Sequence, residues 1–153
     1  MYRIPIYRVQ LVRDGSQRAE RKKVSQPAVA EVLWHFLEGA DREHFVVVLL
    51  DTQNQIIGLH TVTVGTLDAS LVHPREIFKA AILANSAAIL LAHNHPSGDP
   101  TPSVEDRSIT RLLVEAGLIL GIEVLDHVVL GESPRYYSFR ETGGIASTMV
   151  GAW

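Results

Sequence analysis

AAILLAHNHPSGDPTPSVED, residues 87–106, is the stretch of the sequence that decides the fold. Its apolar opening over 87–92 predicts a buried strand. The following segment contains three prolines and a glycine, which predict a stiff loop. Ser103 is a good N-cap and predicts that a helix begins there. A buried strand, a rigid loop and a capped helix are therefore expected to follow one another within these residues.

Two histidines stand where the predicted strand ends. His93 and His95 are two residues apart, so their side chains are expected to leave the strand on the same face. Two imidazoles placed in this way can reach one zinc ion at about 2.0–2.1 Å. Asp106 falls in the first turn of the predicted helix, where the helix dipole favours a carboxylate, and it supplies a third ligand. Three protein ligands with one position left for water are typical of a catalytic zinc site.

The same residues also admit structural interpretations. Ser103 with Asp106 resembles an ordinary capping box. A single histidine at a strand end is more often structural than a ligand, and a His-x-His pair alone is a weak signal. The combination of both histidines, a rigid loop and an acidic, capped helix start favours the metal site. Because the sequence has no cysteine, any transition metal must be held by His, Asp or Glu.

The rest of the chain alternates between helical and strand patterns. Strands are predicted at 2–12, 43–51, 56–64, 122–130 and 135–139, and helices from Ser25 to Gly39, from Pro74 onward, and from Ser103 to Gly117 or Gly121. Helices mixed with a hairpin predict an α/β (α+β mixed) fold, in which helices flank a mixed sheet. We expect an N-terminal strand and basic loop over 1–24, one catalytic domain over 25–140 and a flexible tail over 141–153.

Composition limits the kinds of partner. The 153 residues carry a net charge of −3, and the basic cluster at 18–23 is short and interrupted by Glu20, so charge gives no support for nucleic-acid binding. The longest apolar runs are far too short to cross a bilayer. The first residues lack the apolar core of a signal peptide. We therefore expect a cytoplasmic protein with no membrane partner.

One longer pattern resembles a known family. His93-x-His95, seven residues, and then Ser103-x-x-Asp106 is similar to the motif of the JAMM/MPN metalloproteases in spacing and residue type. The string HNHPSGDPTPSVEDRSIT over 93–110, with PRE at 74–76 before it and DH at 126–127 after it, resembles the RadC branch of that family. The resemblance extends over residues 28–139, which is nearly the whole predicted domain.

The resemblance carries expectations about fold and chemistry. It implies a JAMM-type α/β fold with a cytidine-deaminase-like mixed sheet, and one zinc ion per chain held by His93, His95 and Asp106. It also implies a zinc-bound water activated by a glutamate from an earlier strand, and Glu43, which opens EHFVVVLLD, fits that position. Glu76 is the alternative, although the helix dipole alone would favour an acidic residue there. By the same pattern, Ser103 would hydrogen-bond the developing oxyanion while also capping its helix.

Other polar residues near these patterns have less definite roles. Asp126 and His127 lie inside the apolar strand pattern LDHVVLG and could line the site, although we interpret His127 as a satisfied core histidine. Asn94 is expected to point away from the two ligands and to form local hydrogen bonds. The remaining histidines have no partners at ligand spacing and are treated as background: His35, His44, His60 and His73.

Taken together, the residues and the resemblance favour a zinc metallopeptidase that cleaves a peptide or isopeptide bond in a peptide or protein substrate. A RadC-type DNA-repair factor or nuclease is the first alternative. The acidic balance counts against it, and the helix-hairpin-helix-like module that precedes the domain in longer RadC-like proteins is not expected in this short form. The HNH string at 93–95 is not the HNH nuclease motif, whose residues are spread over a longer segment. A non-catalytic MPN scaffold is the second alternative, against which the complete ligand set argues.

Overall fold

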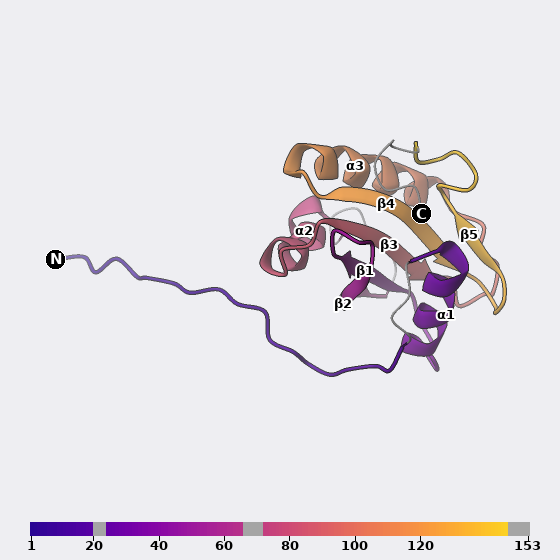
Figure 1. Cartoon of the computed structure of the whole chain (residues 1–153), viewed down its shortest axis with the longest axis horizontal. Coiled ribbons are helices and arrows are strands. Elements are labelled where there is room, and N and C mark those ends of the chain that lie inside the picture. Colours follow the sequence, from indigo (N-terminus) through magenta and orange to yellow (C-terminus); the bar gives the residue numbers. More distant parts are fainter. Residues whose placement is uncertain (20–23, 66–71, 147–153) are drawn as a thin grey trace.

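A five-stranded mixed sheet forms the centre of the protein in the computed structural model, which describes residues 1–19, 24–65 and 72–146 (Figure 1). The strands are β1 (His44–Leu50), β2 (Ile56–Val64), β3 (Ala88–Asn94), β4 (Glu123–Leu130) and β5 (Tyr136–Ser138). Their order in space is β2-β1-β3-β4-β5. β3 and β4 pair in parallel, whereas the other neighbours pair antiparallel. The mixed sheet predicted from the sequence is confirmed.

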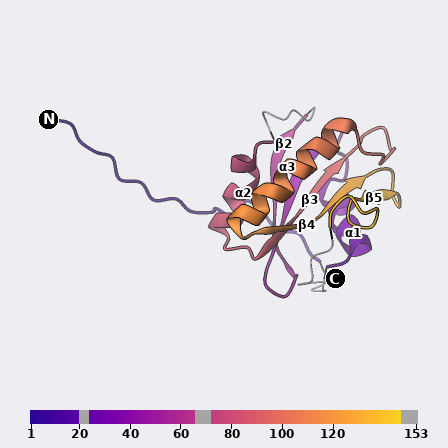
Figure 2. The same cartoon turned by 90° about the horizontal axis from the view of Figure 1, so that it is seen from above.

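Helices cover both faces of this sheet. They are α1 (Gln26–Phe36), α2 (Pro74–Leu83) and α3 (Val104–Leu120). One apolar cluster joins the sheet to α2 and α3, and a second joins its other face to α1. Figure 2 shows α3 lying over the sheet. The three layers confirm a sheet flanked by helices and place β1 and β3 in the middle of the core.

The apolar runs in the sequence follow from this layering. β1 is almost completely buried, because Phe45, Val47 and Leu49 pack toward α2 and α3 while Val46, Val48 and Leu50 pack toward α1. β3 alternates in the same way. A strand covered on both faces is expected to carry apolar side chains along most of its length. The first polar residues of β3 are therefore found at its end, in His93 and Asn94.

The ends of the helices agree with the sequence in most respects. Ser103 and Asp106 form a complete capping box at the start of α3, and Gly121 ends that helix with φ +71°. Ser25, where a helix was predicted to begin, is the N-cap residue of α1, but its side chain makes no capping hydrogen bond. At α2, His73 Nδ1 accepts a hydrogen bond from the amide of Arg75 at 3.1 Å. His73, for which the sequence predicted no role, is therefore the N-cap of α2.

The N-terminal segment does not add a strand to the sheet. Residues 1–19 contain no helix or strand, and Figure 1 shows them leading away from the domain. The strand predicted at 2–12 is wrong: its residues have the side chains of a strand but no partner strand to accept their backbone hydrogen bonds. The side-chain amide of Gln17 donates from Nε2 to the carbonyl of Val32 in α1 at 3.1 Å. Residues 20–23, the rest of the predicted basic loop, lie outside the described chain.

The C-terminal residues pack further than expected. The flexible tail was predicted to begin at 141, yet Ile145 is buried in the core cluster beside α3. The amides of Gly144 and Ile145 donate to the carbonyl of Phe139 at 2.6 and 3.2 Å. The prediction is therefore wrong for 141–146, and 147–153 lie outside the described residues. Within the described part of the chain, no helix is long and apolar enough to cross a membrane.

Candidate metal centre

The three ligands proposed from the sequence meet where β3, the loop after it and α3 come together. His93 belongs to β3, and Asp106 lies in the first turn of α3. His95 follows β3 directly, and its amide donates to the carbonyl of Leu130 at 2.8 Å, which continues the pairing with β4. The two histidines therefore stay in strand alignment, and their side chains leave the same face. Among the described residues, these three side chains form the group able to share a metal ion.

The spacing of the three ligand atoms fits a tetrahedral ion. The Nε2 atoms of His93 and His95 are 3.0 Å apart, and each is 3.3 Å from Oδ2 of Asp106. Ligands bound at about 2.0–2.1 Å on a tetrahedron are separated by about 3.3–3.4 Å. The group thus has the size of one face of a zinc coordination shell, and its two imidazoles with one carboxylate form a ligand set that zinc prefers.

Asp106 forms the predicted capping box, and its position is also compatible with the metal-ligand interpretation. The Ser103 amide donates to Asp106 Oδ2 at 2.8 Å, and the Asp106 amide donates to Ser103 Oγ at 3.0 Å. The same Oδ2 atom also faces both imidazoles. Burial alone would raise the pKa of Asp106, but the His93 side chain and the Ser103 amide outweigh it and hold this pKa well below its usual range. The carboxylate is therefore ionised and aimed between the histidines.

The loop after β3 fixes the orientation of His95. Its Nδ1 atom lies 2.8 Å from the carbonyl oxygen of Asp99, so Nδ1 carries the proton and Nε2 keeps its lone pair. Asp99 is itself held, because its Oδ1 accepts hydrogen bonds from the amide and the hydroxyl of Thr101. The loop also packs closely against the β4–β5 connection, where a Cβ on Gly131 would lie 2.4 Å from the carbonyl oxygen of Gly98. The stiff loop predicted from its prolines and glycine thus holds one imidazole in place.

Behind the ligands lies His127, which is completely buried. Its Nε2 is 2.8 Å from His93 Nδ1, and its Nδ1 is 2.5 Å from the hydroxyl of Thr110. His127 is thus a satisfied core histidine, as the sequence indicated, but its partner is one of the proposed ligands. Sequence reasoning missed Thr110, although its position one turn after Asp106 on the same helix was an available signal.

Glu43 lies just before β1, and the strand register indicates where it stands. Phe45 is paired with His93 in the antiparallel register of β1 and β3. Extending this register by two residues puts Glu43 opposite His95, on the same face as Phe45, which stacks on the His93 ring at 5.9 Å. Glu43 is partly buried, and its carbonyl accepts a hydrogen bond from Gly65 at 2.7 Å. Continued alternation from Phe45 predicts that the Glu43 side chain lies on the same side of the sheet as the histidines.

Asn94 holds the backbone on both sides of Glu43. Its Oδ1 accepts from the amide of His44 at 2.7 Å, and its Nδ2 donates to the carbonyl of Arg42 at 3.1 Å. Asn94 lies between His93 and His95 in sequence and points the other way, as expected. Its hydrogen bonds tie the residues that flank Glu43 to the end of β3. The competing Glu76 lies on the exposed first turn of α2, where Lys79 pairs with it at 2.9 Å.

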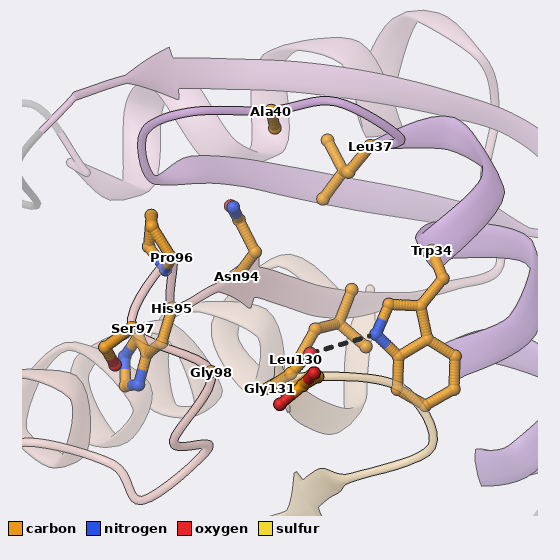
Figure 3. Close-up of a pocket in the computed structure, with 11 residues that line it drawn as sticks. Trp34, Leu37, Ala40, Asn94, His95, Pro96, Ser97, Gly98, Leu130 and Gly131 are labelled. Atoms are coloured by element: carbon orange, nitrogen blue, oxygen red, sulfur yellow. Dashed lines mark hydrogen bonds between the residues drawn. The ribbon is translucent and has the colours of Figure 1, made fainter.

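A pocket of about 460 Å³ opens beside His95 (Figure 3). We call it the His95 pocket, and it is lined by Trp34, Leu37, Ala40, Asn94, His95, Pro96, Ser97, Gly98, Leu130, Gly131 and Glu132. The indole of Trp34 donates to the carbonyl of Gly131 at 3.1 Å, which fixes the aromatic wall. Apolar side chains from α1 therefore face the polar loop that carries His95.

The chain is similar to known proteins over most of its length. The family model of the RadC-like JAB domain matches residues 24–144. UPF0758 proteins are 56% identical over 115 residues in Desulfitobacterium hafniense, 58% over 116 in Symbiobacterium thermophilum and 44% over 127 in Methanosarcina barkeri. These matches cover 75%, 76% and 83% of this chain and 50%, 49% and 55% of the relatives. The chain thus spans about half the length of the curated relatives it matches.

Proposed function

The chain belongs to the RadC-like JAB domain family, and from this premise we propose that it is a zinc-dependent hydrolase that cleaves peptide or isopeptide bonds. The observation that carries the proposal is the spacing of the Nε2 atoms of His93 and His95 and the Oδ2 atom of Asp106, 3.0–3.3 Å apart. A bound zinc ion would supply Lewis acidity and would make water acidic enough to act as a nucleophile near pH 7.

The side chains around the three ligands have separate tasks in this proposal. Glu43 takes the proton of the attacking water and returns it to the leaving amine. The hydroxyl of Ser103, one helical turn before Asp106, donates a hydrogen bond to the oxyanion that develops on the scissile carbonyl. His93, His95 and Asp106 cannot perform these proton transfers, because their lone pairs are committed to the metal. Each task is thus assigned to a different side chain.

The His95 pocket is the proposed seat for a residue of the substrate. It adjoins one of the ligands, and its walls combine the apolar Trp34 and Leu37 with the polar loop around Ser97. Concave sites with apolar walls and a few polar groups are typical of ligand binding. We expect the pocket to hold the side chain next to the scissile bond. Narrowing the pocket by Ala40→Leu would then raise KM while leaving the metal content unchanged.

Two measurements test the proposal directly. Elemental analysis of protein purified without nickel-affinity chromatography is expected to find one zinc per chain. The His93→Ala/His95→Ala variant is expected to contain none. The zinc-loaded protein is then screened against a peptide library, isopeptide-linked peptides and a phosphodiester substrate, with the double variant as the matched control. Hydrolysis of a phosphodiester alone would replace the peptidase by a nuclease. Zinc binding without turnover on any substrate class would favour a scaffold.

A further inference from the structure

A line of hydrogen bonds runs through the apolar core directly behind the ligands. It begins at Nδ1 of His93, passes through both ring nitrogens of His127 and ends at Thr110, whose hydroxyl donates to the carbonyl of Asp106 at 2.6 Å. His127 and Thr110 are both buried. The line therefore joins the β3 ligand to the α3 ligand through a residue of β4.

Two aromatic rings, which offer no hydrogen bond to its nitrogens, pack against His127. Phe139 stacks on it with ring centroids 5.0 Å apart, and Phe45 meets its edge at 5.5 Å. His127 is completely buried between these two apolar rings, and a charged ring in such surroundings is far more costly than a neutral one. A neutral imidazole donates from one ring nitrogen and accepts at the other. The two hydrogen bonds of His127 must therefore run in one direction.

That direction is fixed from the Thr110 end. A threonine hydroxyl has one hydrogen, and that of Thr110 is used on the carbonyl of Asp106. Its oxygen therefore accepts from His127 Nδ1, which must carry the ring proton. Nε2 of His127 then has a lone pair and accepts from Nδ1 of His93. With its proton on Nδ1, His93 is left with a lone pair on Nε2, the atom that faces Asp106.

We propose that His127 is a positioning residue that fixes the tautomer and the ring orientation of His93, and that Thr110 sets the direction of its hydrogen bonds. The inference deepens the proposed function, because it rests on His93 being a metal ligand. The opposite tautomer of His93 would carry its proton on Nε2 and could not bind a metal through that atom. Partners that orient ligand histidines typically contribute 10–100-fold to metal affinity.

Variants of His127 separate its hydrogen bond from its packing. His127→Phe fills the space between the two phenylalanines but removes the acceptor, and the zinc dissociation constant is expected to rise about 10–100-fold. His127→Gln offers a side-chain oxygen as an acceptor and is expected to recover most of the affinity. The control is Phe139→Leu, which removes the stacked ring without changing a hydrogen bond. It is expected to lower the melting temperature and to leave zinc affinity unchanged.

The readouts are zinc affinity by competition with a chromophoric chelator, the visible spectrum of the cobalt-loaded protein, and thermal unfolding of the metal-free protein. Wild-type zinc affinity in a folded His127→Phe variant would overturn the inference. So would an equal loss of affinity in Phe139→Leu, because packing alone would then account for it. Failure of wild-type protein to bind zinc would instead overturn the proposed function.

The tautomers can also be measured without any substitution. Nitrogen-15 NMR of the histidine rings in metal-free wild-type protein is expected to find the proton on Nδ1 in both His93 and His127. This measurement needs neither a bound metal ion nor a folded variant. A His93 ring that carries its proton on Nε2 and none on Nδ1 would overturn the inference even if zinc binds.

Discussion

Two aspartates are buried in the described part of the chain, and they respond to burial in opposite ways. Asp106 is 3% exposed and Asp126 is completely inaccessible. The pKa of Asp106 lies well below its usual range, because the His93 side chain and the Ser103 amide outweigh the effect of burial. Burial raises the pKa of Asp126 to about 6, although three hydrogen bonds act to lower it. Two aspartates that are both buried thus have opposite shifts in pKa.

The partners of each carboxylate explain the difference. Asp106 Oδ2 lies 3.3 Å from each of two imidazoles, groups that can carry positive charge or share a cation. Asp126 accepts hydrogen bonds from the hydroxyl of Ser138 and from two backbone amides, which link β4 to β5 and the turn after it. All of those donors are neutral. The comparison separates a carboxylate that lies between two imidazoles, where a cation could bind, from a carboxylate that accepts hydrogen bonds from neutral donors only.

The largest expected effect comes from neutralising each aspartate in turn. Asp106→Asn is expected to abolish stoichiometric zinc binding and all hydrolysis, because it removes the anionic ligand between the histidines. Asp126→Asn is the matched control, with the same chemical change at a buried site, and is expected to keep one zinc per chain. Elemental analysis measures the zinc content of both variants, and turnover measures their hydrolytic activity. Equal zinc content in the two variants would remove Asp106 from the ligand set.

A third carboxylate extends the comparison to the proposed base. Glu43→Gln keeps the shape of the side chain and removes its basicity, so hydrolysis is expected to fall by about 10²–10⁴. Zinc content is expected to remain at one per chain, which distinguishes this variant from Asp106→Asn. Glu76→Gln serves as the control and is expected to leave turnover unchanged. Loss of zinc from Glu43→Gln would make Glu43 a ligand or a structural residue, and full activity would move the base elsewhere.

The Ser103→Ala variant tests whether the hydroxyl that caps α3 also takes part in catalysis. Ser103→Ala is expected to cost about 0.5–2 kcal/mol in the free energy of unfolding, because the Asp106 amide loses its acceptor. If the hydroxyl also donates to the oxyanion, turnover per folded molecule falls by about 10²–10³ as well, and this is the outcome we expect. Urea unfolding and kcat on the same sample separate the effects. Unchanged turnover in the folded variant would leave Ser103 with capping alone.

Much of this architecture could be predicted because local sequence and tertiary structure agree. β1 and β3 are apolar throughout, so their existence and burial were predictable, and the Ser103–Asp106 cap fixed the start of α3. The strand predicted at 2–12 failed for the opposite reason. Its side chains favour a strand, but a strand also needs a hydrogen-bonding partner, and local sequence does not report whether one is available.

In the candidate site too, residues close together in sequence could be predicted, whereas those brought in by strand pairing could not. His93, His95 and Asp106 lie close together in sequence, so strand and helix geometry was enough to predict that their side chains meet. His127 reaches His93 through the parallel pairing of β3 with β4, in which Leu91 is opposite His127. The register between two strands that are separated by a whole helix cannot be predicted from local sequence. The partner of His127, and with it the direction of the hydrogen bonds behind the site, became visible only with the sheet.

The last expected effect concerns the dependence of stability on pH at Asp126. Its pKa of about 6 in the folded protein lies above the ordinary value of 3.8, so the folded state binds more protons than the unfolded state between these values. The free energy of unfolding therefore falls as pH rises from 4 to 6. A shift of this size corresponds to about 3 kcal/mol, at about 1.4 kcal/mol per pH unit. Asp106, whose pKa is lowered, acts with the opposite sign and below pH 4.

Asp126→Asn isolates this contribution, because asparagine keeps the acceptor for the two amides and carries no charge at any pH. Relative to wild type, the variant is expected to gain stability as pH rises from 4 to 7, by about 3 kcal/mol in total. Urea unfolding of both metal-free proteins across this range measures the difference, and contributions from the histidines and from Asp106 largely cancel in it. A difference that does not change with pH would mean that Asp126 keeps an ordinary pKa. The contrast between the two buried aspartates would then lie in their partners and not in their ionisation.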